Sequence, residues 1–177
     1  MTPTLPPGSY SLADGSMFNL LAPDPALITI DLIAIGLSKT CRYSGQLPGD
    51  VFYSVAEHSV LVSHLVPAPL ALAGLLHDAS EGLGMSDVVS PLKKLLPDYK
   101  AIEARVMCAV AKAFNLDEDA FDSADVKAAD RAILEAEQIQ IRNRPAKRPV
   151  DDRYAPPADM AAAGLAFHCF DPGHARG

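Results

Sequence analysis

The sequence predicts an all-α fold preceded by an irregular N-terminal arm. The apolar stretches are rich in Ala, Leu and Val and recur with helical spacing, without the alternation typical of strands. Hydrophobic residues make up 49% and charged residues 21% of the chain, a balance that argues against disorder. With 177 residues the chain can bury one good core, so we expect a single domain.

The predicted elements follow from Gly and Pro punctuation between these apolar patterns. Residues 1–25 carry five prolines and two glycines and predict the irregular arm, with a short hairpin around Asp14 and Gly15. Ser54 with Glu57 three residues later is a capping box, which marks a helix start. Residues 145–157 predict a connecting loop. Helices are expected at about 25–38, 54–65, 68–81, 91–95, 98–115, 117–143 and 158–167.

Bulk properties exclude several classes of function. A net charge of −7 argues against a partner that is a nucleic-acid polymer, because phosphate-backbone affinity comes from clustered Lys and Arg. The three cysteines are far apart and form no C-x-x-C pair, and no P-loop or Gly-x-Gly-x-x-Gly pattern occurs. The apolar stretch 26–37 is much shorter than the roughly 20 residues of a membrane span. We therefore expect a cytoplasmic protein without a membrane partner.

A histidine and an aspartate follow directly after an almost wholly apolar run, residues 70–76. Burying the carboxylate of Asp78 beside His77 is costly unless a partner compensates it, and a divalent metal would do so. His58 and Asp130 lie on two other predicted helices. Two imidazoles and two carboxylates form a mixed ligand set that suits Mn, Fe, Co, Ni or Zn and leaves room for water. The sequence therefore predicts one divalent transition metal and a hydrolytic reaction.

Two further carboxylates could take part in proton transfer. Glu81 lies four residues after His77 and three after Asp78, hence on the same face of a continuing helix. Asp87 follows a Gly-containing loop and could return to the site from the other side, although a helix cap or turn is an equal interpretation of an Asp there. We predict both as catalytic residues.

The order of these motifs resembles that of the HD-domain metal-dependent phosphohydrolases. The similarity extends over roughly residues 19–137 and is greatest to the branch of bacterial 5′-deoxynucleotidases and phage deoxyadenosine-triphosphate triphosphohydrolases. It rests on four segments: 55–59 (VAEHS), 76–81 (LHDASE), 90–93 (SPLK) and 129–131 (ADR). The resemblance implies an HD-domain helical bundle with its core at about 19–143 and a C-terminal extension over 144–177.

The resemblance also implies roles for individual residues. The metal would be held by His58, His77, Asp78 and Asp130, with Glu81 serving the attacking water. Arg42 stands where the family places an arginine for phosphate, and Tyr43 where it places an aromatic residue that crowds the sugar 2′ position. Lys93 is a candidate second phosphate contact. For these three substrate-binding candidates, a surface arginine, a core aromatic residue and a solvated lysine are the alternatives.

The implied activity is hydrolysis of 2′-deoxynucleotides at the α-phosphate of a mono- or triphosphate. A second divalent ion could accompany the substrate phosphates. Related enzymes oligomerise, and apolar positions such as Ile102, Val106 and Ile139 could exceed one small core, so we expect a homo-oligomer. Two alternatives stay open: a nucleotide- or metal-sensing module without turnover, and a hydrolase of an alarmone or cyclic dinucleotide.

Overall fold

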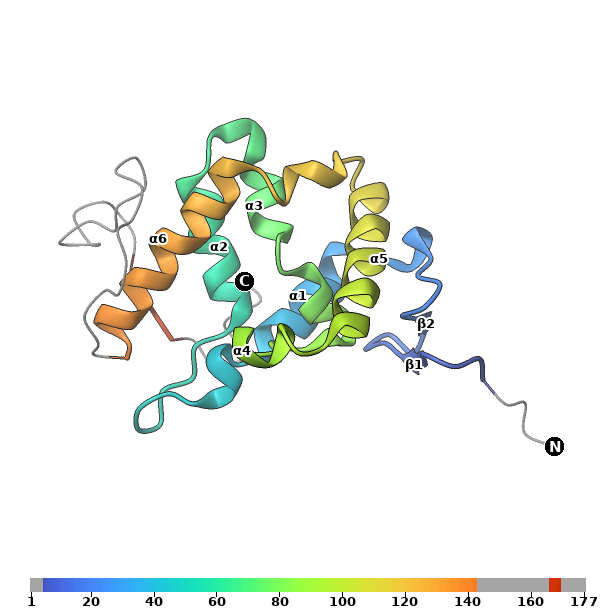
Figure 1. Cartoon of the computed structure of the whole chain (residues 1–177), viewed down its shortest axis with the longest axis horizontal. Helices are drawn as coiled ribbons and strands as arrows, with labels where there is room; N and C mark the ends of the chain where they lie inside the picture. The colour runs from blue at the N-terminus through green and yellow to red at the C-terminus, as the bar shows by residue number, and fades with distance from the viewer. Residues whose placement is uncertain (1–4, 143–165, 170–177) are drawn as a thin grey trace.

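Helices make up most of the molecule, which confirms the all-α prediction (Figure 1). The computed structural model describes residues 5–142 and 166–169. A short antiparallel hairpin, β1 (Ser9–Ser11) with β2 (Met17–Asn19), pairs Tyr10 with Phe18 and turns through Asp14 and Gly15, as predicted. The α-helices are α1 (Ile30–Lys39), α2 (Val55–Leu65), α3 (Ala71–Leu76), α4 (Ser90–Lys93), α5 (Pro97–Ala113) and α6 (Ala124–Gln140).

Side-chain caps set the starts of three of these helices. The hydroxyl oxygens of Thr29, Ser54 and Ser123 accept hydrogen bonds from the backbone N–H groups three residues later. Ser54 begins α2 as the capping box predicts, with 3.1 Å between its Oγ and the N of Glu57. These caps fix where α1, α2 and α6 emerge from the preceding loops.

Two predicted helices are each divided in two by an additional cap. The helix expected at 25–38 is a 3₁₀ turn, η1 (Pro25–Leu27), followed by α1, because Asp24 caps the first and Thr29 the second. The helix expected at 117–143 is a 3₁₀ turn, η5 (Glu118–Ala120), followed by α6, because Asp117 and Ser123 each accept from a nearby N–H. The predicted ranges were wrong at these breaks.

The helix expected at 68–81 is also wrong as a continuous element. A 3₁₀ turn, η3 (Ala68–Leu70), leads into α3, which ends at Leu76; His77 and Asp78 form a turn, and the chain then widens into a π-helical turn, η4 (Glu81–Met85). Gly36 of α1 and Gly82 of η4 allow the backbones to touch: a Cβ at Gly36 would lie 1.9 Å from the Gly82 carbonyl oxygen. π-Turns of this kind are frequent at functional sites.

Two buried clusters of apolar side chains hold the helices in place. One packs α1, α3 and α5 with the hairpin and includes Phe18, Ile33 and Leu76. The other packs α2 against α6 and includes Val62 and Ile133. Each fully buried side chain of this size contributes about 1.5–3 kcal/mol. Leu76 in the first cluster directly precedes His77, and Ala129 in the second directly precedes Asp130, so both clusters position site residues.

The described parts of the chain include no helix that is both long and apolar enough to cross a membrane. The loop predicted at 145–157 lies outside the described residues, as does most of the helix predicted at 158–167; residues 166–169 are not helical. Phe167 packs edge-on against Tyr53, with 5.4 Å between the ring centroids.

Candidate metal centre

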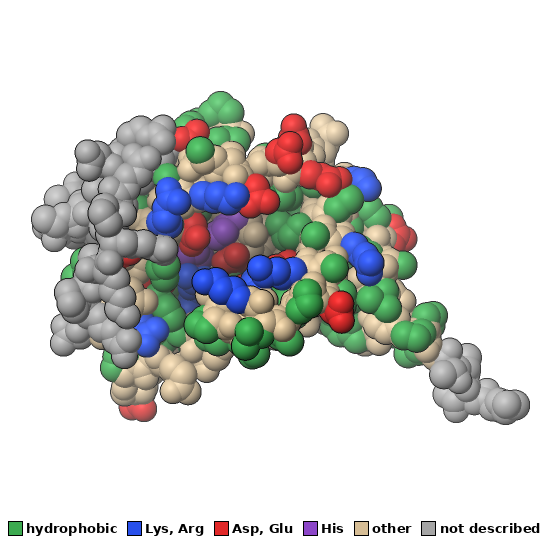
Figure 2. Space-filling model, in the orientation of Figure 1, with side chains coloured by type: hydrophobic (Ala, Val, Ile, Leu, Met, Phe, Trp, Pro, Cys, Tyr) green, Lys and Arg blue, Asp and Glu red, His purple; other side chains and the backbone are tan. Residues whose placement is uncertain are grey.

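A hollow of about 480 Å³ opens between α4, α5 and α6. Histidine and acidic side chains lie on its floor, and Lys and Arg side chains gather around its mouth (Figure 2). His77, Asp78 and Asp130 line the hollow, together with Lys93, Lys100 and Lys127. Three of the four predicted metal ligands therefore face a space that a small molecule could enter.

The ligand candidates come from three elements. His58 lies in the first turns of α2, behind the Ser54 cap, and is fully buried. His77 and Asp78 occupy the turn that ends α3, and Asp130 lies in the middle of α6. Residues that are 72 positions apart in the sequence thus meet at one point because α2, α3 and α6 pack together.

Three of these residues have the geometry of a cation site. The Nε2 atom of His58 lies 3.3 Å from Nε2 of His77 and 3.2 Å from Oδ1 of Asp130, and Nε2 of His77 lies 4.0 Å from the same oxygen. Ligand atoms about 2.1 Å from one ion lie within about 4.2 Å of one another, so these spacings fit. His58, His77 and Asp130 can therefore hold a metal ion.

Asp78, the fourth predicted ligand, lies beside this group. Its Oδ2 atom is 3.3 Å from Nε2 of His77 and 3.8 Å from Nε2 of His58. The same oxygen is 3.5 Å from Nη1 of Arg42. Asp78 thus lies between the candidate metal ligands and a buried guanidinium group.

Hydrogen bonds donated by the Nδ1–H groups fix both imidazole rings. Nδ1–H of His77 donates to the carbonyl oxygen of Gly74 at 2.8 Å, and Nδ1–H of His58 donates to Oε1 of Glu137 at 2.7 Å. Because Nδ1 is the donor in each ring, Nε2 is the atom that faces the other ligands, which is the orientation that metal-binding histidines need.

The charges of the centre shift its protonation equilibria. Burial and Arg42 lower the pKa of His58, but Glu137 and Asp130 raise it more, to about 9. Burial raises the pKa of Asp130, yet His58, His77 and Arg42 together hold it well below its usual range. A divalent cation would compete for Nε2 of His58 with the proton that these carboxylates favour.

Arg42 and Tyr43 lie next to the centre on a strained turn, η2 (Arg42–Gly45). Tyr43 and Ser44 adopt left-handed φ values of 59° and 51°. Asp87 holds this turn: its Oδ2 atom accepts the N–H of Tyr43 at 2.8 Å, and its carbonyl oxygen accepts the Ser44 hydroxyl at 3.2 Å. Arg142 stacks over the Tyr43 ring at 4.4 Å. The structure thus connects Asp87 to the turn that carries the predicted substrate-binding pair.

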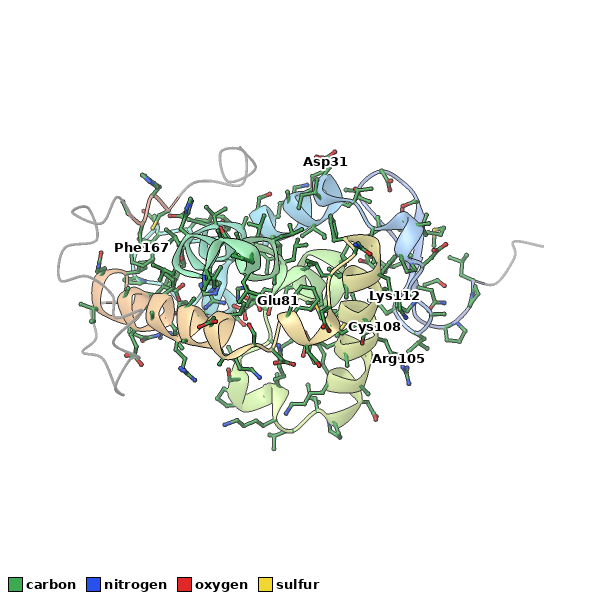
Figure 3. The ribbon with its side chains drawn as sticks, turned by 90° about the horizontal axis from the view of Figure 1, so that it is seen from above. Asp31, Glu81, Arg105, Cys108, Lys112 and Phe167 are labelled. Atoms are coloured by element: carbon green, nitrogen blue, oxygen red, sulfur yellow. The ribbon has the colours of Figure 1, made fainter. Side chains whose placement is uncertain are left out.

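Glu81 lies near the middle of the molecule, where Figure 3 labels it, and is almost fully buried. Its Oε1 atom is 4.0 Å from Nζ of Lys93, which also pairs with Glu103 at 2.7 Å. Its Oε2 atom has no hydrogen-bond partner among the described residues. Burial and the neighbouring Asp78 and Asp87 raise the pKa of Glu81 to about 10.

Comparison with known proteins finds uncharacterized relatives. No protein-family model matches the chain. YfdR, an uncharacterized protein of Escherichia coli, is 42% identical over 114 residues, which cover 64% of this chain and only 61% of YfdR. An uncharacterized protein of Rhodobacter capsulatus is 35% identical over an alignment of 177 positions, which covers 93% of this chain and 88% of the relative. The chain belongs to the family of this Rhodobacter protein. The site itself must therefore carry any functional argument.

Sequence reasoning missed one member of the centre, Glu137. This residue is fully buried, and its carboxylate contacts His58, Arg42 and Tyr43. It follows Asp130 by seven residues, which is two turns of α6, so both side chains lie on one face. That spacing was visible in the sequence and could have indicated a second carboxylate facing α2.

Proposed function

We propose that this protein is an HD-domain, metal-dependent phosphohydrolase that cleaves 2′-deoxynucleotides at the α-phosphate of a mono- or triphosphate. The observation that carries the proposal is the meeting of His58, His77 and Asp130, with Asp78 beside them. All of them except the buried His58 line one hollow. Two imidazoles with carboxylates form a mixed ligand set that leaves positions for water and substrate.

The reaction chemistry follows from this ligand set and its neighbours. A bound divalent cation would lower the pKa of a water and polarise a phosphoryl oxygen. Burial and Asp78 raise the pKa of Glu81 to about 10, so its carboxyl group is protonated at neutral pH in the cation-free protein. A cation bound beside Asp78 would lower this pKa, and the Glu81 carboxylate could then take a proton from water. Lys93, within 4.0 Å of Glu81, supplies positive charge beside that carboxylate. Asp87 keeps the Arg42–Tyr43 turn in place.

An anionic substrate would depend on the bound cation as well as on the lysines of the hollow. Three lysines, from α4, α5 and α6, line the hollow together with six carboxylates, and a divalent cation would offset part of this negative charge. Behind Asp78, Arg42 places a guanidinium group, which is suited to phosphate oxygens. The ring of Tyr43 lies beside the guanidinium groups of Arg42 and Arg142. In the proposed complex this ring would crowd the sugar 2′ position and disfavour a 2′-hydroxyl group.

The test is a turnover assay of chelator-stripped protein resupplied with Mn²⁺, Co²⁺, Ni²⁺, Zn²⁺ or Fe²⁺. The substrates are deoxy- and ribonucleotides at each phosphorylation level, with an alarmone and a cyclic dinucleotide added. We expect deoxynucleotide hydrolysis that the chelator abolishes and that Asp130→Asn and Glu81→Ala each reduce by at least 100-fold. Asp31→Asn, an exposed carboxylate of α1, is the matched control and should leave the rate unchanged.

The other outcomes identify the alternatives. Absence of turnover on every compound would contradict the hydrolase proposal. Tight nucleotide binding without turnover, unchanged by Glu81→Ala, would identify a sensing module. Turnover of the alarmone or cyclic dinucleotide alone would keep the hydrolase and exclude the deoxynucleotide substrate.

A further inference from the structure

The carboxylate of Glu137 occupies an unusual position in α6. It has no solvent exposure, and it lies behind the candidate ligands rather than among them. An ionised carboxylate with zero exposure needs charged or hydrogen-bonding partners, because its desolvation otherwise costs several kcal/mol. The identity of its partners therefore indicates what it is for.

The two oxygens of Glu137 face different parts of the centre. Oε1 accepts Nδ1–H of His58 at 2.7 Å. Oε2 lies 3.4 Å from Nη2 of Arg42 and accepts the hydroxyl of Tyr43. One carboxylate thus touches a candidate metal ligand on one side and the predicted phosphate- and sugar-binding pair on the other.

The contact with His58 determines which ring nitrogen can bind a cation. With Nδ1–H donated to Glu137, Nε2 is left to face His77 and Asp130. A carboxylate in this position also raises the basicity of the imidazole as a ligand. Nδ1–H of His77 donates to a neutral acceptor, the carbonyl oxygen of Gly74. Of the two imidazoles, His58 is therefore the one whose Nδ1–H is held by a charged group, the carboxylate of Glu137.

The contact with Arg42 determines where the guanidinium group lies. Arg42 is almost fully buried and pairs with Glu137 through Nη2 and with Asp78 through Nη1. A cation that bound the Asp78 carboxylate would compete with Arg42 for it. The ion pair between Arg42 and Glu137 would not be affected in this way. Glu137 can therefore hold Arg42 while the cation and the substrate bind.

We propose that Glu137 is a positioning residue that couples the cation site to the anion-binding turn: it aims Nε2 of His58 at the cation and, with its other oxygen, holds Arg42 and Tyr43. This inference rests on the proposed function, since it concerns the same centre. It assigns no catalytic step to Glu137 itself.

The test compares the wild-type protein with Glu137→Gln, which keeps the shape of the side chain and removes its charge. Mn²⁺ is titrated into chelator-stripped protein by calorimetry, and methylphosphonate, which cannot be hydrolysed, is then titrated at saturating Mn²⁺. We expect Glu137→Gln to bind Mn²⁺ about 10–100-fold more weakly, as is usual when an outer partner of a metal-binding histidine is lost. Methylphosphonate should also bind more weakly.

Glu135→Gln is the matched control. Glu135 is the other glutamate of α6 that is buried, and two residues along a helix place it on a nearly opposite face. Thermal unfolding by circular dichroism reports any loss of stability in both variants. We expect Glu135→Gln to keep its Mn²⁺ affinity within about threefold whatever its melting temperature, because Glu135 lies on a nearly opposite face of α6 from Glu137.

Several results would overturn the inference. Wild-type Mn²⁺ affinity in folded Glu137→Gln would show a structural role only, and weakened Mn²⁺ binding with unchanged methylphosphonate binding would remove the coupling. If Glu137→Gln does not fold, Glu137→Asp decides: it keeps the charge but shortens the reach, so unchanged Mn²⁺ affinity contradicts the inference. A wild-type protein that binds no Mn²⁺ would contradict the proposed function itself.

Discussion

At the scale of single residues, the centre depends on a buried ion pair between His58 and Glu137. Burial raises the pKa of Glu137, but Arg42 and His58 lower it more, to about 2, while the pKa of His58 rises to about 9. Each partner therefore favours the charged form of the other, and in cation-free protein the pair is ionised at neutral pH.

This ion pair predicts a pH dependence of stability. A folded-state pKa of about 9 for His58, against an ordinary value of 6.5, gives a contribution that is complete below pH 6.5 and lost as the pH rises through 9. The loss is on the order of 3 kcal/mol. Urea unfolding of chelator-stripped protein at pH 6, 7.5 and 9.5 measures it. Saturating Mn²⁺ should weaken the trend, because a metal-binding imidazole is neutral, and equal stability at all three pH values in stripped protein would contradict it.

Residue types and spacing predicted much of this centre. His77 and Asp78 stood out because they follow an apolar run. His58 and Asp130 were candidates because they are metal-ligand residue types on two other predicted helices, and the structure places all four close together. Roles for Arg42, Tyr43, Glu81, Asp87 and Lys93 stay predictions. The contacts of Arg42 and Asp87 were not predictable, because they depend on left-handed backbone at Tyr43 and Ser44, residue types that seldom adopt it.

At the scale of elements, the close approach of α1 and η4 decides where Glu81 lies. The sequence pattern 68–81 indicated one helix because apolar periodicity does not report a widened backbone turn. The widening depends on a tertiary contact between Gly36 and Gly82, which no local pattern shows. The extra caps at Thr29 and Ser123, in contrast, were visible in the sequence and explain the two other breaks.

The contact between α1 and η4 predicts the effect of Gly36→Ala. The new Cβ would lie 1.9 Å from the Gly82 carbonyl oxygen, so backbone must move, and overpacking of this kind costs about 1–3 kcal/mol. We also expect lower hydrolytic activity, because η4 begins at Glu81. Gly74→Ala is the control: its Cβ would lie 3.1 Å from a methyl carbon of Val66 and 3.3 Å from Cα of Ser63, contacts that a shift of a few tenths of an ångström relieves. Urea unfolding gives both values, and an equal or smaller loss for Gly36→Ala would be evidence against this packing account.

At the scale of the whole molecule, the fold brings acidic and histidine side chains to the floor of one hollow and lysines to its wall (Figure 2). The prediction of a homo-oligomer loses part of its basis, since Val106 is buried within the chain and Ile102 is half-buried, although Ile139 is exposed. Self-association stays a prediction. The centre needs α2, α3 and α6 together, so its assembly depends on the packing of the entire helical core.

The most direct test of the account is an anomalous-difference map from crystals of protein loaded with Mn²⁺, recorded on both sides of the manganese absorption edge. We predict one peak about 2.0–2.3 Å from Nε2 of His58, Nε2 of His77 and a carboxylate oxygen of each of Asp78 and Asp130. A fully loaded crystal without this peak, or with its manganese bound elsewhere, would contradict the convergence of these four side chains on a single cation.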